Sequence, residues 1–248
     1  MPRQARKKSK SGIYHIMLRG INHQLIFEDD EDMQRFIETL KRYKKECGYS
    51  LYAFCLMGNH IHILLKEGPE PIAAVLKRIA GSYVYWYNWK YSRSGHLFQD
   101  RFKSEPVEDD TYFLTVLRYI HQNPVKARIC PNAQNYPFSS MQEYLHKSEI
   151  TDTDFAFSII SKEEFISYHN EINDDCCLEL EPFSKMTDND AKIIIYTTTK
   201  CKTPADFQLL DKPTRNKYIG KLYAQGLSVR QICRLTGLSK KIVENNIT

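Results

Sequence analysis

The run LYAFCLMGNHIHILLK, residues 51–66, constrains the fold of this chain more than any other stretch. It reads as two short apolar strands, residues 51–56 and 60–66, separated by Gly58-Asn59. A Gly-Asn pair tolerates positive φ and is typical of a tight turn between antiparallel strands. We therefore expect a β-hairpin that belongs to a larger sheet.

Two histidines of the second strand point the same way. Side chains alternate across a strand, so His60 and His62 project from one face and the intervening isoleucines from the other, into a core. Two imidazoles roughly 6 to 7 Å apart along a strand can hold one divalent ion. The alternative is a pair of histidines with satisfied hydrogen bonds on a half-buried strand, and a His-x-His motif alone does not decide between them.

The remaining predicted elements indicate a mixed α+β domain. Periodicity and capping residues predict strands over residues 13–19 and 96–107 and helices over residues 33–48, 72–91 and 109–123. The order strand, helix, strand, strand, helix, strand, helix is that of a ferredoxin-like antiparallel sheet with helices on one face. In such a sandwich the last helix can lie across the strand face that bears the two histidines.

The last of these helices carries a candidate nucleophile. Asp109 favours its start and Pro124 is expected to stop it. Tyr119 and Asn123 are four residues apart, so they share one helix face with Cα atoms about 6 Å apart. A hydroxyl nucleophile and a carboxamide oxygen therefore point the same way.

Three other residues are weaker candidates for chemistry. Tyr112 lies on the same face two turns earlier and is a rival nucleophile by spacing, but no ligand follows it one turn later. His121 would face away from the nucleophile, which argues against a role as its base. His15, on the first strand, is interpreted as a structural residue or a DNA contact rather than a ligand.

Charge is distributed unevenly along the chain. The net charge is +5, from 35 Lys and Arg against 30 Asp and Glu. Residues 1–10 carry five Lys or Arg and no acid, residues 148–190 carry twelve acids and two Lys, and residues 212–248 carry eight Lys or Arg and one Glu. Basic segments at both ends favour a polyanionic partner such as nucleic acid, although an ordinary solvated surface is the alternative.

Cations and aromatic rings of the first 110 residues are candidates for DNA contacts. Arg19, Arg101 and Lys103 alternate with apolar residues on predicted strands and are expected to meet a DNA strand. The helix over residues 72–91 ends in YVYWYNWKY, whose rings could stack on unpaired bases. We expect most of these rings to be core and only the exposed minority to stack.

The final residues have the pattern of a helix-turn-helix. Ser228 and Ser239 are expected to cap two helices, and Gly237 to form the turn between them. Four cations stay outside the joint and are available for phosphates: Arg230, Arg234, Lys240 and Lys241. The alternative is an ordinary helical hairpin.

Composition also suggests how the chain is divided and where it resides. We expect a basic arm (residues 1–12), a catalytic domain (13–147), an acidic connector (148–185) and a helical DNA-binding domain (186–248). The seven cysteines are scattered and form no C-x-x-C pair, which indicates reduced thiols. No run approaches the roughly 18 apolar residues of a membrane span and no signal peptide is evident, so a soluble, cytoplasmic protein without a membrane partner is expected.

Four motifs in order, within residues 13–145, resemble the single-tyrosine HUH transposases, which comprise insertion-sequence enzymes and REP-associated relatives. They are YHIMLRG, LMGNHIHILL, GHLFQDRFKS and LRYIHQNPVKA. The resemblance implies that His60 and His62 are the metal-binding pair, that Tyr119 is the nucleophile, and that Asn123 is a third ligand. It implies a Mg²⁺ or Mn²⁺ cofactor, a 5′-phosphotyrosine intermediate, and single-stranded, hairpin or palindromic DNA as substrate.

Two functions of different classes follow. The first is a metal-dependent endonuclease and strand transferase that acts on single-stranded DNA, as a monomer or as a homodimer. The second is a sequence-specific regulator that binds duplex DNA through the helix-turn-helix and whose sheet domain is catalytically silent.

Overall fold

The structure, a computed structural model, describes residues 6–99, 101–171, 173, 175–178 and 188–247. The chain divides into two compact units, Met1–Glu179 and Leu180–Thr248, which we describe separately. Within the described ranges no helix is long and apolar enough to cross a membrane.

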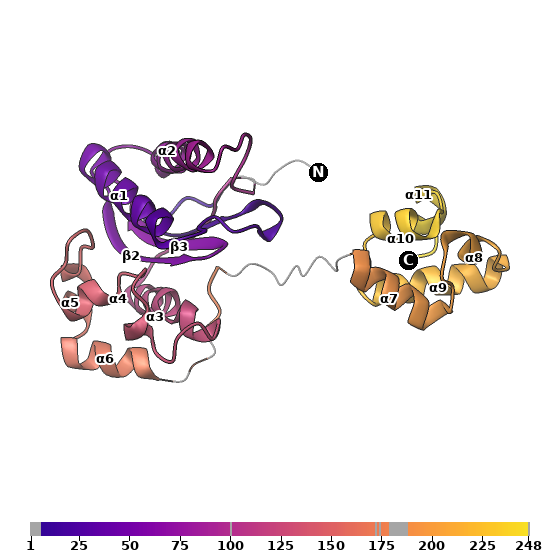
Figure 1. The fold of residues 1–248 in the computed structure, drawn as a ribbon. Coiled ribbons are helices and arrows are strands. Elements are labelled where there is room, and N and C mark those ends of the chain that lie inside the picture. The colour runs from indigo at the N-terminus through magenta and orange to yellow at the C-terminus, as the bar shows by residue number, and fades with distance from the viewer. Residues whose placement is uncertain (1–5, 100, 172, 174, 179–187, 248) are drawn as a thin grey trace. The chain divides into compact units, whose positions relative to one another are not determined.

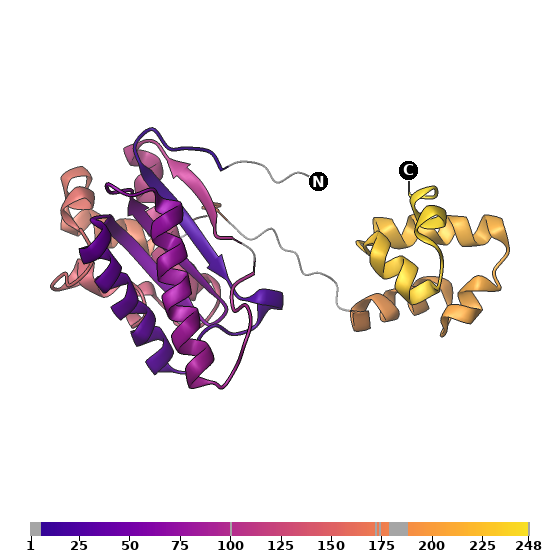
Figure 2. The same ribbon diagram turned by 90° about the horizontal axis from the view of Figure 1, so that it is seen from above.

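Four antiparallel strands form the centre of the first unit (Figures 1 and 2). They are β1 (Ile13–Arg19), β2 (Ser50–Met57), β3 (His60–Lys66) and β4 (Lys103–Val107), in the order β2-β3-β1-β4. β2 and β3 form the predicted hairpin, and β1 pairs with β3 so that Arg19 lies opposite His60. The α+β class predicted from the order of elements is confirmed.

The turn of the hairpin differs from the expectation. Neither Gly58 nor Asn59 has a positive φ, so the type of turn that the Gly-Asn pair indicated is wrong, although the hairpin is confirmed. Gly58 instead permits a close approach of the preceding loop. Its carbonyl accepts hydrogen bonds from the Ile26 and Phe27 amides (2.8 and 3.3 Å), and a Cβ atom there would lie 3.2 Å from Leu25 Cδ2.

Helices cover both faces of the sheet, so the expectation that they lie on one face is wrong. Figure 1 shows α1 (Asp30–Cys47) and α2 (Ile72–Lys90) on one face and α3 (Asp110–Lys126) on the other. β2 and β3 are nearly continuous apolar runs whose side chains are buried along most of their length. Both of their faces therefore need a cover.

Capping residues explain where two of these helices begin and end. At the start of α1, Asp29 forms a capping box with Asp32, and the helix ends at Gly48, which adopts the left-handed conformation with φ 67°. At the start of α3, the Asp109 side chain accepts a hydrogen bond from the Tyr112 amide. The start of α3 agrees with the prediction from Asp109, whereas α1 begins before the predicted range of residues 33–48.

Two predicted boundaries are wrong. Pro124 does not stop α3, which continues to Lys126 with the proline inside its last turn. A proline there leaves few carbonyls without a partner, so the helix tolerates it. The strand expected over residues 96–107 begins only at Lys103, because Phe98 forms an isolated bridge with Gly20 beyond the end of β1.

The acidic connector expected over residues 148–185 is also wrong for its first half. It contains α5 (Asp154–Ile159) and α6 (Lys162–Asn170), and Ala156 and Phe165 are fully buried in the core beneath α3. The acids of this stretch obscured an apolar pattern in the same residues. Residues 179–187 lie outside the described residues.

The first unit also contains η1 (Ile21–His23), η2 (Ala133–Asn135) and α4 (Met141–Leu145).

The second unit consists of helices over its described residues. They are α7 (Asp188–Thr199), α8 (Pro204–Gln208), α9 (Lys212–Ala224), α10 (Val229–Thr236) and α11 (Lys240–Glu244). Ser228 forms a capping box at the start of α10, and Gly237 ends it with φ 71°. Ile232, Leu238 and Val243 are buried at the joint between α10 and α11.

Candidate active site

The two histidines of β3 lie on the face of the sheet that α3 covers. Their ring centroids are 5.1 Å apart. Ile61 and Ile63, which alternate with them, belong to the core on the opposite face, beneath α1 and α2. The predicted alternation is therefore confirmed, and both imidazoles face the helix that carries Tyr119.

Tyr119 on α3 contacts the imidazole of His62. The centroid of its ring is 5.5 Å from that of His62, and the two rings meet edge to face. Only 5 % of Tyr119 is exposed. The sheet and the helix thus bring together residues 57 positions apart in the sequence, as the pattern predicted.

Asn123 lies one helical turn after Tyr119 and contacts the other histidine. Its Nδ2 donates to the Tyr119 carbonyl (3.1 Å), which leaves its Oδ1 as an acceptor. Its side chain also hydrogen-bonds to His60. The four residues predicted from sequence, His60, His62, Tyr119 and Asn123, therefore form one cluster.

Two residues that sequence reasoning did not assign to the site complete its buried side. His15, on β1, is fully buried, and its Nε2 lies 2.9 Å from His62 Nδ1. Its Nδ1 lies 2.7 Å from Glu105 Oε1 on β4. The available signal was the alternation of β1, which placed His15 on the same face as Arg19, but no prediction named Glu105 as the partner of His15.

Burial keeps the histidines of this cluster neutral. It lowers the pKa of His60 to about 4, with a further decrease from the charge of Arg19 and an opposing effect of the Asn123 hydrogen bond. It also lowers the pKa of His62 well below its usual value, and the neighbouring His15 and His60 add to this effect. Neutral imidazole is the form that binds metals.

Glu105 stays ionised at the end of this chain of rings. Burial opposes its ionisation, but hydrogen bonds from His15, the Leu178 amide and Tyr112 outweigh that effect, so its pKa is lowered. The Leu178 amide donates to the same oxygen, Oε1, at 2.8 Å. A carboxylate with three donors around it is held in one orientation.

The donor set suits a divalent ion with a partly open coordination sphere. Across the described residues no trio of His, Cys, Asp or Glu is arranged to hold a metal ion. The available donors are two imidazoles and one carboxamide oxygen. In both histidines Nδ1 is already engaged, with Asn59 Oδ1 at 2.7 Å for His60 and with His15 for His62. Their Nε2 atoms are the ones that would bind an ion, with water or phosphate oxygens as further ligands.

The weaker candidates of the helix are engaged elsewhere. Tyr112 hydrogen-bonds to Glu105 and Cys177, and burial raises its pKa. His121 is fully buried between His169 Nε2 (3.0 Å) and Ser140 Oγ (2.8 Å), in the core beneath α3. Neither residue competes with Tyr119 for the position beside the histidines.

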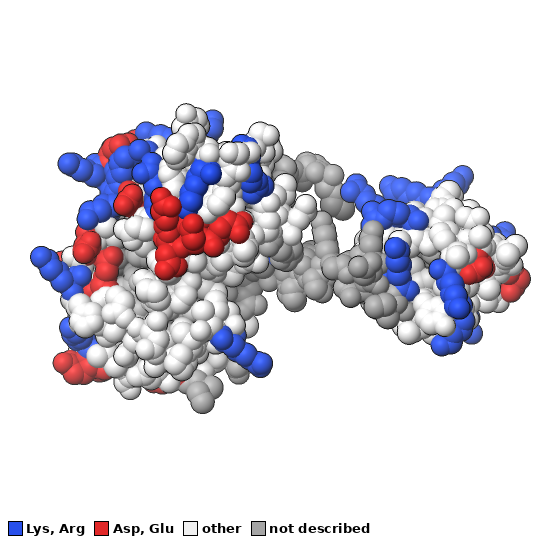
Figure 3. Space-filling view, viewed as in Figure 1, with Lys and Arg blue, Asp and Glu red and all other residues white. Residues whose placement is uncertain are grey.

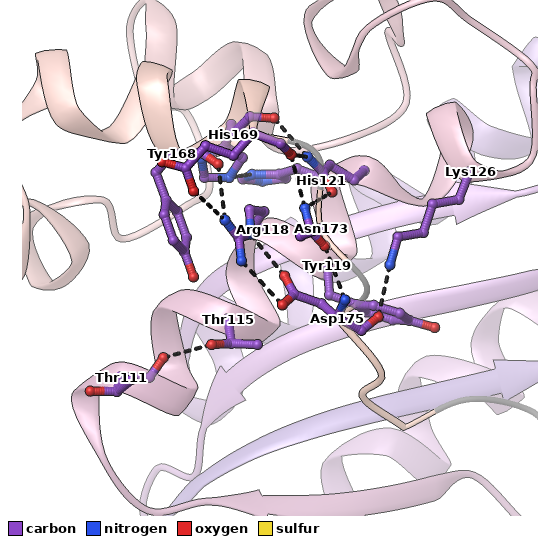
Figure 4. Close-up of polar contacts among 12 residues, drawn as sticks. Thr111, Thr115, Arg118, Tyr119, His121, Lys126, Tyr168, His169, Asn173 and Asp175 are labelled. Atoms are coloured by element: carbon purple, nitrogen blue, oxygen red, sulfur yellow. Dashed lines mark hydrogen bonds and ion pairs between the residues drawn. The ribbon is translucent and has the colours of Figure 1, made fainter.

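A lysine beyond the predicted end of the helix also approaches Tyr119. Lys126 Nζ lies 4.9 Å from the centroid of the Tyr119 ring and donates to the Asp175 carbonyl at 2.8 Å. Figure 4 shows Asp175 beside Lys126 and Tyr119. The Asp175 carboxylate pairs with Arg118 at 2.8 and 3.1 Å. The prediction that Pro124 ends α3 is the reason why sequence reasoning missed Lys126.

One of the three cations predicted to contact DNA in the first unit borders the site, and the other two lie in or before β4. Arg19 pairs across the sheet with His60, so it borders the cluster. Lys103 begins β4, opposite Met17, and Arg101 lies in the preceding loop, and both are exposed. Among the rings of α2, Tyr83 and Tyr87 are buried and Trp86 packs against the same core, whereas Tyr85 and Trp89 are exposed, in agreement with the expectation that most are core.

In the second unit all four predicted cations are exposed. They are Arg230 and Arg234 on α10 and Lys240 and Lys241 on α11. Figure 3 shows Lys and Arg side chains outnumbering acidic ones on the visible face of this unit. Lys240 also lies 3.3 Å from Glu244, an exposed pair that leaves its other donors available.

Comparisons with known proteins identify relatives of the first unit. Residues 8–123 match a family described as transposase IS200 like. A solved structure of a REP-associated tyrosine transposase bound to a REP hairpin is 17% identical to this chain. The match covers 62% of this chain and 90% of the chain in that structure, with a TM-score of 0.51. A Deinococcus radiodurans protein described as a transposase is 16% identical, covers 60% of this chain and 100% of its own, and has a TM-score of 0.34. No curated protein sequence matches.

Proposed function

We propose that this chain, whose residues 8–123 match the IS200-like transposase family, cleaves and rejoins single-stranded DNA by attack of Tyr119 on a backbone phosphate. The observation that supports this most directly is the 5.5 Å between the ring centroids of Tyr119 and His62. A phenol and two neutral imidazoles in contact combine a nucleophile with the ligands for a cation.

In the proposed reaction each residue of the cluster has one role. His60, His62 and Asn123 would hold a divalent cation, which would supply polarisation of the scissile phosphate and neutralisation of developing charge. The Tyr119 oxygen forms a bond to phosphorus as its proton leaves, and the bond from phosphorus to the 3′ oxygen breaks. The products are a 5′-phosphotyrosine and a free 3′-hydroxyl, and attack by another 3′-hydroxyl reverses the step.

The tyrosine needs help to lose its proton. With an unperturbed pKa near 10, only ~0.1% of a tyrosine is ionised at pH 7. Lys126 Nζ, 4.9 Å from the ring centroid, adds positive charge beside the phenol in this structure. That charge favours phenolate, so Lys126 joins the cation in lowering the barrier.

We propose hairpin or palindromic single strands as the substrate class. A solved relative with the same fold is described as bound to a REP hairpin. Arg19 at the edge of the cluster and the exposed Arg101 and Lys103 provide cations for the phosphates of such a strand. The second unit, with its exposed cations on α10 and α11, would bind adjacent duplex DNA.

The test is formation of a covalent adduct. End-labelled hairpin oligonucleotides are incubated with the protein and Mn²⁺, and adducts that survive denaturation are separated by electrophoresis. Wild type and Tyr112→Phe are expected to form the adduct and Tyr119→Phe to form none. An adduct of equal yield with Tyr119→Phe would contradict the proposal.

The second candidate, a catalytically silent regulator, rests on the exposed cations of the second unit. It predicts tight, salt-sensitive binding of duplex DNA that survives both His60→Ala and Tyr119→Phe, with no cleavage of any hairpin. The same oligonucleotides and proteins therefore distinguish the two functions.

A further inference from the structure

A buried chain of hydrogen bonds connects three strands of the sheet behind the candidate active site. It runs from Glu105 on β4 through His15 on β1 to His62 on β3, with distances of 2.7 and 2.9 Å. His15 is fully buried and His62 is 2 % exposed, so water does not compete for the bond between them, and Glu105 at the end of the chain is partly buried. The chain is built into the sheet, since His15 is the cross-strand partner of Glu105.

The acceptor at one end determines the direction of every hydrogen bond in this chain. An ionised carboxylate can only accept, so His15 Nδ1 carries a proton and donates to Glu105. In a neutral ring the other nitrogen, His15 Nε2, is then an acceptor. The proton of the second hydrogen bond therefore belongs to His62 Nδ1.

The proton on His62 Nδ1 determines the state of the other ring nitrogen, Nε2. A neutral imidazole with a proton on Nδ1 has a lone pair on Nε2. If the chain ran in the other direction, Nε2 would carry the proton and could not bind a cation. The protonation state of His62 Nε2, the nitrogen that faces away from His15, is therefore determined by His15 on the adjacent strand and by Glu105 on the strand beyond it.

We propose that Glu105 and His15 are positioning residues that hold His62 in the Nδ1–H tautomer, so that its Nε2 presents a lone pair for a divalent cation. This deepens the proposed function and rests on it for the role of His62. Partners of this kind behind metal-binding histidines fix the tautomer and the ring orientation, and their loss typically lowers metal affinity 10- to 100-fold.

The surroundings of Glu105 make one substitution conservative. Its Oε1 accepts from both His15 Nδ1 and the Leu178 amide. In Glu105→Gln the amide oxygen must occupy that position, because an NH₂ group there would meet the Leu178 N–H. The direction of the chain is then preserved, whereas His15→Phe removes the acceptor for His62 altogether.

The first experiment measures the tautomer directly. Long-range ¹H–¹⁵N correlation spectra of the imidazole rings are recorded on the full chain without metal or DNA. We expect His62 as Nδ1–H in wild type and in Glu105→Gln, and a shift toward Nε2–H in His15→Phe. His62 as Nε2–H in wild type, or an unchanged tautomer in His15→Phe, would overturn the proposal.

The buried pair His121 and His169 provides an internal control for folding. His169 Nδ1 donates to the Phe165 carbonyl at 2.9 Å, and this fixes the tautomers of both rings independently of His15. Their signals should be the same in all three proteins, which would show that the core beneath α3 is intact in His15→Phe.

The second experiment measures Mn²⁺ affinity by calorimetry on the same proteins without DNA. We expect His15→Phe to bind about 10- to 100-fold more weakly than wild type and Glu105→Gln to bind nearly as well as wild type. Equal affinity in wild type and His15→Phe would overturn the proposal. A wild type with the expected tautomer but no Mn²⁺ binding would instead contradict the metal role in the proposed function, whose own test is the covalent adduct.

Discussion

The first unit contains buried histidines whose imidazole rings stay neutral. The site contains His15 and His62, with His60 half-buried beside them, and the core beneath α3 contains two more, His121 and His169. Burial is the main reason for the lowered pKa of both core histidines, which is about 4 for His169. An unfolded histidine has a pKa near 6.5, so the folded and unfolded chains bind protons differently below that value.

We expect the first unit to lose stability as pH falls from about 6.5 toward 4. In this window the unfolded chain binds protons that the folded chain excludes, so the free energy of unfolding decreases by about 1.4 kcal/mol per pH unit for each such proton. Above pH 6.5 these histidines are neutral in both states and contribute no pH dependence. His169→Gln should therefore make the profile shallower in this window.

Urea unfolding followed by tryptophan fluorescence measures this in the first unit alone, because both tryptophans of the chain, Trp86 and Trp89, lie on α2. The control is His96→Gln, whose side chain is exposed and should leave the slope unchanged. Parallel profiles for wild type and His169→Gln would contradict this account.

At the scale of elements, local signals in the sequence were reliable where one residue type determines the backbone. Asp109 marked the start of α3, the predicted end of α1 at residue 48 matches Gly48, and the alternation of β3 placed both histidines on one face. The predictions that failed needed knowledge of distant packing. Pro124 lies inside α3, and the acidic segment carries Phe165 into the core, because tertiary contacts outweighed the local pattern.

The same limit explains which part of the site was missed. Tyr119 and Asn123 were predicted because one helix sets their spacing. His15 and Glu105 were not predicted, because their contact depends on the register between β1 and β4, which is not a local property of the sequence.

The turn between α10 and α11 permits a prediction about one glycine. Gly237 has φ 71°, and a Cβ there would lie 2.1 Å from Gln208 Nε2. Gly237→Ala should destabilise the second unit by about 1 to 2 kcal/mol from the left-handed backbone alone, with a further cost for moving Gln208. Gly220→Ala, within α9 and at ordinary φ, should be neutral or slightly stabilising.

Thermal unfolding followed by circular dichroism reports on both units, while tryptophan fluorescence reports on the first. We expect Gly237→Ala to lower the midpoint of one circular-dichroism transition and to leave the fluorescence transition in place. Equal midpoints for the two alanine variants would show that the left-handed turn does not limit the stability of this unit.

At the scale of the whole molecule, the chain joins a candidate strand-cleaving unit to a second unit with exposed cations. The two units are expected to contact different forms of DNA, single-stranded and duplex. If so, substitutions in one unit should change one activity and leave the other unchanged.

We expect Lys240→Ala/Lys241→Ala to weaken duplex binding and to reduce the slope of log affinity against log salt by about 1.8, since each lost phosphate contact contributes roughly 0.9. Adduct formation on a hairpin should be unaffected. The matched control, Lys41→Ala/Lys45→Ala, removes the same charge from α1 of the first unit and should preserve the slope. An unchanged slope in the α11 variant would mean that these lysines do not contact duplex phosphates.

The most direct test of the central claim is to identify the residue that becomes covalently attached to DNA. The adduct formed with a hairpin oligonucleotide and Mn²⁺ is digested with nuclease and protease, and the peptide that retains a 5′-phosphonucleotide is sequenced by mass spectrometry. We expect the modification on Tyr119. A modification on Tyr112 or any other residue, or cleavage without a covalent adduct, would contradict the account.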